Sequence, residues 1–212
     1  MSSVAIIDYG MGNLHSIAKA IQCADTHAHV QVSSDPSVIL AADRVVFPGV
    51  GAMRDCMSAI RARALDAVIA EAAASKPLLG ICLGMQALLD ESEENGGTRG
   101  LGLIPGKVAR FPDGLQDHSG NKLKIPHMGW NRLHQSFGHP LWSGIAQDSW
   151  FYFVHSYYVQ PAQASMQAAS SDYPDPFTAA VLSGNVFAVQ FHPEKSQAAG
   201  LKLLSNFLSW AP

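Results

Sequence analysis

The chain has 212 residues, of which 48% are hydrophobic and 15% charged, and its 14 basic and 17 acidic side chains leave a net charge of −3. This composition excludes a disordered chain, and the lack of a Lys/Arg cluster disfavours a nucleic-acid-binding protein. The charged fraction falls below the roughly 25% of average domains, a deficit typical of a surface that a partner covers. We expect a single domain over residues 1–212.

The number and spacing of the cysteines, together with the hydropathy of the chain, indicate where in the cell the protein is located. The three cysteines, Cys23, Cys56 and Cys82, are odd in number and lack CxxC spacing, which predicts reduced thiols rather than a disulfide framework. The first residues lack a basic segment and reach Asp8 too soon for a signal peptide. The longest uncharged stretch, residues 149–171, is broken by polar side chains and cannot span a membrane. We therefore expect a cytoplasmic protein that binds neither membrane nor nucleic acid.

The first half of the chain alternates short apolar runs with helical patterns. Strands are predicted over residues 4–8, 29–33, 44–47 and 77–81, and helices over the segment that ends at 24, over 55–74 and over 83–89. The helix over 55–74 is expected to be long and amphipathic, because its apolar residues recur four apart. Strands separated by helices indicate βαβ units and a parallel sheet.

The second half is richer in strands. They are predicted over residues 103–111, 122–125, 150–159, 177–182 and 186–191, and a helix with an apolar face closes the chain around 201–208. Ser183-Gly184-Asn185 predicts a hairpin between the last two strands. Residues 113–124 predict a polar loop or hairpin tip. We expect an α/β fold with a central, mostly parallel sheet to which the second half adds antiparallel strands.

The sharpest chemical feature is Gly80-Ile81-Cys82-Leu83-Gly84, a cysteine between a predicted strand and a predicted helix. Glycines two residues away on either side fit a nucleophile elbow, a turn too tight for side chains at its flanks. The helix N-terminus would favour a thiolate at Cys82, and the N–H of Leu83 would point to a developing oxyanion. The alternative is a buried structural cysteine, the commoner fate of a lone one. The glycines and the strand–helix context favour catalysis.

A nucleophilic thiol needs a base, and Phe191-His192-Pro193-Glu194 supplies one at the end of a predicted strand. Residues two apart in extended backbone face the same way, so His192 and Glu194 can touch. On its own, His-x-Glu is a weak motif, and the alternative is a loop histidine beside a surface glutamate. Together with Cys82 it predicts a triad in the order Cys, His, Glu.

Gly-Ile-Cys-Leu-Gly-Met-Gln with a distant Phe-His-Pro-Glu resembles the class I (triad) glutamine amidotransferases. Further blocks are similar to the glutaminases of that family that serve histidine biosynthesis, and they cover nearly the whole chain. These blocks are Asp8-Tyr-Gly-Met-Gly-Asn13, Phe47-Pro-Gly-Val-Gly-Ala52, Pro126-His-Met-Gly-Trp-Asn131, Phe151-Tyr-Phe-Val-His-Ser-Tyr157 and His192-Pro-Glu-Lys-Ser196. The resemblance implies a three-layer, flavodoxin-like fold.

The resemblance also implies roles for individual residues. Cys82 would attack the side-chain amide of L-glutamine, His192 would move the protons, and Glu194 would orient the imidazole. The implied oxyanion donors are the backbone groups of Leu83, Val50 and Gly51, and the loop that carries the last two can flip its peptide. The implied glutamine contacts are Gly49, Gln86 and the backbone of His155, Ser156 and Tyr157. For Gln86, the residue pattern alone fits an ordinary polar helix residue equally well. Neither a cofactor nor a metal is implied.

Ammonia released into water would mostly be protonated and therefore lost to synthesis. The resemblance implies a partner that receives the ammonia directly. That partner is a (β/α)8-barrel synthase/cyclase subunit, bound as a heterodimer, with ammonia channelled between the subunits. The implied docking residues are Asn13, Met128, Trp130, Asn131 and Lys195. A Gly-Trp-Asn turn in a polar stretch favours an exposed aromatic anchor at Trp130, although Trp130 could belong to the core and Lys195 could be a solvated charge.

Three alternatives to this reading stay open. The nearest is a class I glutaminase that serves anthranilate, aminodeoxychorismate or pyridoxal phosphate synthesis. A non-catalytic relative that kept only the fold is disfavoured, because it would have no physical need for all of Cys82, His192 and Glu194. The third is an independent cysteine hydrolase that cleaves γ-glutamyl bonds without a partner.

Overall fold

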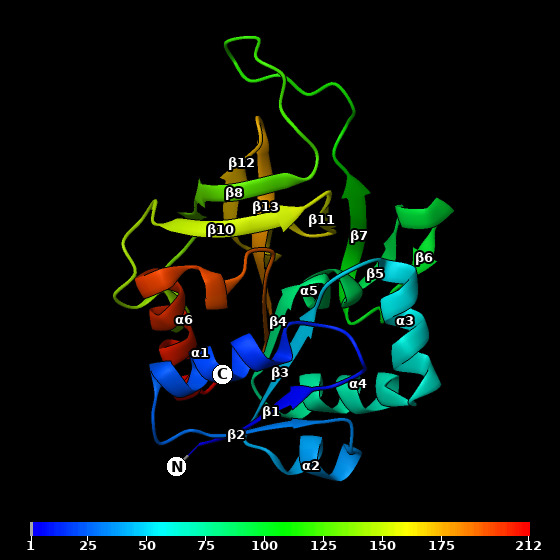
Figure 1. Cartoon of the computed structure of the whole chain (residues 1–212), viewed down its shortest axis with the longest axis vertical. Coiled ribbons are helices and arrows are strands. Elements are labelled where there is room, and N and C mark those ends of the chain that lie inside the picture. Colours follow the sequence, from blue (N-terminus) through cyan, green and yellow to red (C-terminus); the bar gives the residue numbers. More distant parts are fainter. Residues whose placement is uncertain (1) are drawn as a thin grey trace.

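The computed structural model describes residues 2–212 as a central sheet with helices on both faces (Figure 1). Five parallel strands form one half of this sheet, in the order β2 (His29–Ser33), β1 (Ser3–Ile7), β3 (Arg44–Gly49), β4 (Leu78–Cys82) and β14 (Val186–Val189). The apolar runs of β1, β3, β4 and β14 are continuous because both faces of a parallel sheet are covered, whereas the edge strand β2 is largely exposed. The carboxyl ends of β3 and β4 therefore meet at one edge, where the predicted nucleophile lies.

Antiparallel pairing extends the sheet beyond β14. The order continues with β13 (Pro176–Ser183), β11 (Tyr157–Pro161), β7 (Ile104–Arg110), β5 (Leu89–Ser92) and β6 (Thr98–Arg99), while β12 (Gln167–Asp172) pairs with β13 and with β9 (His134–Gln135). Within this half, β5 and β7 run parallel. The hairpin predicted at Gly184-Asn185 is confirmed, since Ser183 pairs with Val186. A separate two-stranded sheet, β8 (His127–Arg132) with β10 (Trp150–His155), lies across the first (Figure 1).

Two helical layers cover the sheet and bury alternate strand residues. On one face α1 (Leu14–Ala24) packs against α6 (Gln197–Ser209), and the core there contains Val4 and Ile6. On the other face lie α2 (Pro36–Ala41), α3 (Met53–Ala62), α4 (Leu65–Ser75) and α5 (Leu83–Ala87), over Ala5 and Ile7. Short 3₁₀ turns are η1 (Glu94–Gly96), η2 (Pro140–Trp142), η3 (Ala164–Met166) and η4 (Pro193–Lys195). The expected α/β class is thus confirmed.

The single long helix predicted over residues 55–74 is wrong. The chain forms α3 and α4 instead, separated at Ala64, whose φ of 51° is left-handed. No glycine or proline marks this break in the sequence. The physical reason for it lies in packing: α3 packs against α5, whereas α4 packs against α2, and one straight apolar stripe would not serve both neighbours.

Three further expectations need correction. The helix predicted to end at residue 89 ends at Ala87, because β5 begins at Leu89. The strand predicted over 150–159 is two strands in different sheets, and Ser156 lies at the break. Residues 122–125 form no strand, and only Lys122 makes an isolated bridge, within the polar loop that the sequence does predict. Within residues 2–212, no helix is long and apolar enough to cross a membrane.

Candidate active site

Cys82 is the last residue of β4 and the residue before α5, with φ 54° and ψ −112°. A non-glycine residue rarely adopts this conformation, and strain of this kind clusters at functional sites. The two flanking glycines are required because atoms of neighbouring strands lie too close for a side chain at either position. A Cβ on Gly84 would lie 2.0 Å from the carbonyl oxygen of Phe47, and one on Gly80 would lie 2.9 Å from the Cβ of Ala188. The structure confirms the tight strand–helix turn that the sequence predicts.

His192 and Glu194 touch, as their spacing predicts. Nδ1 of His192 lies 2.8 Å from Oε1 of Glu194, and the two side chains are 3% and 1% exposed. A carboxylate can only accept, so Nδ1 carries a proton and Nε2 is left for the thiol. Burial lowers the pKa of His192, but Cys82 and Glu194 favour the charged ring more strongly and raise that pKa to about 9. His192 and Glu194 thus form a buried pair, and the charged ring is suited to holding a proton taken from the thiol of Cys82.

Ser196 holds the His192 segment against β10. Its hydroxyl donates to the carbonyl oxygen of His192 at 2.6 Å and accepts from the N–H of Tyr152 at 3.0 Å. The N–H of His192 in turn donates to the carbonyl oxygen of Tyr152 at 2.9 Å. Ser196 belongs to the His192-Pro-Glu-Lys-Ser196 block of the sequence, but its contacts are revealed only by the structure.

A cavity of about 300 Å³ opens beside the thiol. Its lining contains ten of the predicted site residues: Val50, Gly51, Cys82, Leu83, Gln86, His155, Ser156, Tyr157, His192 and Lys195. Gly49 does not line it: this residue pairs with Cys82 across β3 and β4, and a Cβ there would lie 2.8 Å from the N of Gly84. Glu194 also lies outside the lining, buried behind the imidazole.

The predicted oxyanion loop is held by a buried hydrogen bond at Pro48 and ends in an exposed turn at Val50 and Gly51. The hydroxyl of Tyr9 donates to the carbonyl oxygen of Pro48 at 2.9 Å, in a buried position. Two residues later Val50 is 38% exposed, and Gly51 has φ 91°, a value that favours glycine. The N-terminus of α5, with Leu83, lines the same cavity. Both segments therefore line the cavity that contains the thiol.

Two polar side chains, one in contact with the thiol and one on the cavity lining, were not predicted from the sequence. Gln190 is fully buried, and its amide donates to the sulfur of Cys82 at 3.7 Å and accepts from Nε2 of Gln86 at 3.0 Å. The sequence could have indicated Gln190, because it lies two residues before His192 and alternate residues of an extended segment point to the same side. Glu94 lines the cavity, and its Oε2 accepts from the N–H of Met53 at 2.7 Å. No sequence signal distinguished Glu94.

A thiol beside a histidine that can hold its proton suits acyl transfer, provided that backbone N–H groups of the lining stabilise the oxyanion. The acidic Glu94 and the basic Lys195 on the same lining can pair with a zwitterionic substrate. Among residues 2–212, no cluster of three or more His, Cys, Asp or Glu residues could hold a metal ion.

Only some of the predicted docking residues lie on one surface. On the β8–β10 sheet, Met128 and Trp130 lie on the outer face and are 62% and 43% exposed, and Nζ of Lys195 lies 5.7 Å from the ring centre of Tyr152, opposite Trp130. We call this surface, with Trp150 further along it, the outer face. Asn131 does not share it.

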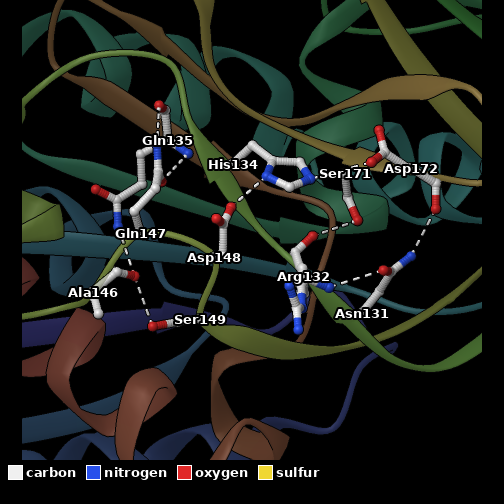
Figure 2. A network of polar contacts seen from close by, with 10 residues as sticks. All are labelled: Asn131, Arg132, His134, Gln135, Ala146, Gln147, Asp148, Ser149, Ser171 and Asp172. Atoms are coloured by element: carbon white, nitrogen blue, oxygen red, sulfur yellow. Dashed lines mark hydrogen bonds and ion pairs between the residues drawn. The ribbon is translucent and has the colours of Figure 1, made fainter.

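The Asn131 side chain turns inward, because neighbouring residues in a strand point to opposite sides. Its Nδ2 donates to the carbonyl oxygen of Asp172 at 2.8 Å, a contact drawn in Figure 2. Asn13 precedes α1 and is half-buried, and its side chain does not cap that helix. Of the predicted set, only Met128, Trp130 and Lys195 gather at the outer face.

Comparison with known proteins adds a family and relatives. The family model described as class-I glutamine amidotransferase matches residues 5–210. The imidazole glycerol phosphate synthase subunit HisH of Methylococcus capsulatus is 71% identical over 100% of this chain and 98% of its own length. The HisH subunit of Thiobacillus denitrificans is 60% identical over 99% of this chain and 92% of its own length.

Two solved structures share the fold at low identity. A structure described as glutamine amidotransferase has a TM-score of 0.73 at 17% identity, covering 97% of both chains. A structure described as PurLQS from Thermotoga maritima has a TM-score of 0.71 at 20% identity, covering 99% of both chains.

Proposed function

This chain belongs to the class-I glutamine amidotransferase family, and from that membership we propose that it is the glutaminase subunit of an imidazole glycerol phosphate synthase. The observation that carries the proposal is the shared cavity in which Cys82 meets the buried His192–Glu194 pair. The relatives named HisH, matched over 98% and 92% of their own length, support this synthase over other members of the family. The other members considered are the glutaminases that serve anthranilate, aminodeoxychorismate or pyridoxal phosphate synthesis.

The proposed reaction proceeds by a thioester. The thiol of Cys82 gives its proton to Nε2 of His192 and attacks the side-chain amide carbon of glutamine. Backbone donors of Leu83 and of the loop with Val50 and Gly51 stabilise the oxyanion. His192 then protonates the leaving nitrogen, so that ammonia departs and a γ-glutamyl thioester remains.

The second half of the reaction releases glutamate. A water gives its proton to His192 as it attacks the thioester carbon, and the proton returns to the sulfur of Cys82 when the C–S bond breaks. Glu194 keeps the imidazole oriented and stabilises its charged form in both halves. The carboxylate of Glu94 and the backbone of Ser156 and Tyr157 are proposed to hold the α-amino and α-carboxylate groups.

We infer a heterodimer with a (β/α)8-barrel cyclase subunit, docked on the outer face. An exposed tryptophan and methionine beside the cavity provide the aromatic and apolar anchors that interfaces prefer. Lys195 belongs both to the cavity lining and to this face, so the ammonia is released next to the partner. The complex would form imidazole glycerol phosphate and release the aminoimidazole carboxamide ribotide by-product, which makes it a lyase. Free cysteines at all three positions suit the cytoplasm.

The experiment is reconstitution of the chain with the cyclase subunit from the same genome. Glutamate formation is measured with the chain alone, with the complex, and with the complex plus the nucleotide substrate of the synthase. We expect glutamine hydrolysis that rises on complex formation and rises again with the nucleotide, since the exposed Val50–Gly51 loop can change its peptide orientation. Full activity of the chain alone would contradict the proposal and indicate an independent hydrolase.

A further inference from the structure

Two buried histidines face each other at the cavity, where His155 belongs to the lining and His127 does not, and their side chains take no part in the chemistry above. His127 and His155 are directly opposite in the β8–β10 sheet, and they are 4% and 6% exposed. Nδ1 of His127 lies 2.9 Å from Nε2 of His155. A buried hydrogen bond between two imidazoles needs one donor and one acceptor, so the two rings have to hold matching tautomers.

The groups at the two ends of the pair fix those tautomers. Nδ1 of His155 lies 2.8 Å from the carbonyl oxygen of Tyr157, which can only accept, so Nδ1 carries the hydrogen and Nε2 accepts. Nδ1 of His127 is then the donor between the rings. Nε2 of His127 accepts from the amide Nδ2 of Asn131 at 3.2 Å, and that amide group can only donate. All three hydrogen bonds therefore point the same way.

Both rings are uncharged at neutral pH and held in place by aromatic neighbours. Burial lowers the pKa of His127 to about 4, and burial together with the neighbouring His127 lowers the pKa of His155 to about 3. The ring of Tyr173 stacks on His127 with centres 4.1 Å apart, and Phe177 packs against His155 at 5.1 Å. The pair is suited to transmitting position and unsuited to supplying a catalytic proton.

The hydrogen bonds continue from Tyr157 to the thiol. The carbonyl oxygen of Tyr157 also accepts from Nε2 of Gln86 at 3.1 Å. The same Nε2 donates to Gln190, whose amide donates to the sulfur of Cys82. Both hydrogens of the Gln86 amide are used in this way, so its oxygen is left for the cavity.

We propose that His127 is a positioning residue for glutamine binding, which acts through His155 to fix the Tyr157 carbonyl and the Gln86 amide in the cavity wall. This inference rests on the proposed glutaminase function. Strand β8 carries His127 on its inner side and Met128 and Trp130 on the outer face. The strand proposed to contact the partner thus also holds the substrate-binding wall.

The test compares variants of His127 in the reconstituted complex. His127→Phe keeps a ring against Tyr173 and Phe153 but removes both hydrogen bonds. We expect the KM for glutamine to rise roughly tenfold, the effect of losing the one buried hydrogen bond that reaches His155, while kcat changes less than about threefold. His127→Asn places an N–H near the lost Nδ1–H, and we expect it to recover most of the wild-type KM.

His139→Phe is the matched control, because His139 is likewise a histidine ring stacked on a phenylalanine, Phe187, but is half-buried and lies outside the cavity. Ammonia-dependent synthesis by each complex shows that the variant has folded and docked. If wild type does not hydrolyse glutamine, the proposed function fails. If wild type is active and His127→Phe has the KM of His139→Phe, or if kcat falls with KM unchanged, this inference alone is overturned.

A measurement on the unmodified complex keeps the inference testable if the variants fail to fold. Nitrogen-15 NMR of the imidazole rings at pH 7 reports which nitrogen carries hydrogen. We expect both His127 and His155 as neutral Nδ1–H tautomers, each with a hydrogen-bonded proton. An Nε2–H tautomer or a charged ring at either position would overturn the proposed chain of contacts.

Discussion

The parallel half of the sheet and the β8–β10 sheet contribute to the candidate site in different ways. In the parallel half, backbone geometry positions the nucleophile. Strand β4 ends in a strained turn that puts Cys82 at the N-terminus of α5, and the carbonyl oxygen of Phe47 leaves no room for a side chain at Gly84. On the other side, β10 and the segment after it build the cavity wall from side-chain contacts, such as His127 with His155. The nucleophile is thus placed by short-range geometry and the wall by long-range polar contacts. The two should respond differently to substitution.

The largest effect is expected in the backbone-determined half. In Gly84→Ala the new Cβ would lie 2.0 Å from the carbonyl oxygen of Phe47, in a turn that has no room to relax. We expect a loss of about 4 kcal/mol or more in the free energy of unfolding and loss of glutamine hydrolysis. Denaturant unfolding measures the first and a glutaminase assay of the complex the second.

Gly138→Ala is the control, because a Cβ there meets nothing within 4 Å and its φ is not positive. Equal stability of the two variants would show that the turn at Cys82 is not constrained by the contact between α5 and β3.

The next largest effect concerns the His192–Glu194 pair. The pKa of His192 is raised to about 9, above the usual value of about 6.5. The charged ring therefore adds stability in full below about pH 6.5, and this stability is lost as the pH rises through about 9. In Glu194→Gln the raising effect of the carboxylate is absent. We expect a lower pKa of His192, a smaller loss of stability over this range, and a kcat reduced about 100-fold or more.

Denaturant unfolding at several pH values measures the stability change, and Glu71→Gln, which removes an exposed acid on α4, is the control. A stability profile of Glu194→Gln that parallels wild type from pH 6.5 to 9 would contradict the assigned coupling.

The smallest effect is expected at the outer face. Trp130→Ala removes an aromatic side chain that is 43% exposed in the free chain, so the chain itself should lose little stability. We expect the dissociation constant of the heterodimer to rise about 30-fold, corresponding to about 2 kcal/mol. Phe137→Ala is the control, since Phe137 is 37% exposed but lies outside the β8–β10 sheet. An equal affinity for both variants would place the partner on another surface.

The same division explains what the sequence could predict. The parallel strands and the turn at Cys82 depend on apolar runs and glycine spacing, which are local, and the hairpin at Gly184-Asn185 likewise follows from its turn residues. The pairing of His192 with Glu194 follows from two-residue alternation in extended backbone. Each of these features needs only a few neighbouring residues.

The rest depends on contacts between distant segments. Nothing local marks Ala64 as the break between α3 and α4, or Ser156 as the point where the chain passes from one sheet to another. The contact between Gln190 and the thiol joins residues 108 positions apart. The inward side of Asn131 could have been predicted from strand alternation with Trp130, had β8 been recognised as a strand.

The central claim is that Cys82 produces ammonia that the partner consumes, and its most direct test is Cys82→Ala in the complex. The measurement is synthesis with glutamine compared with synthesis with ammonium salt, relative to the wild-type complex. We predict that glutamine-dependent synthesis falls to background, while ammonia-dependent synthesis stays within about twofold of wild type. Equal loss of both activities, or retention of glutamine-dependent synthesis, would contradict the account.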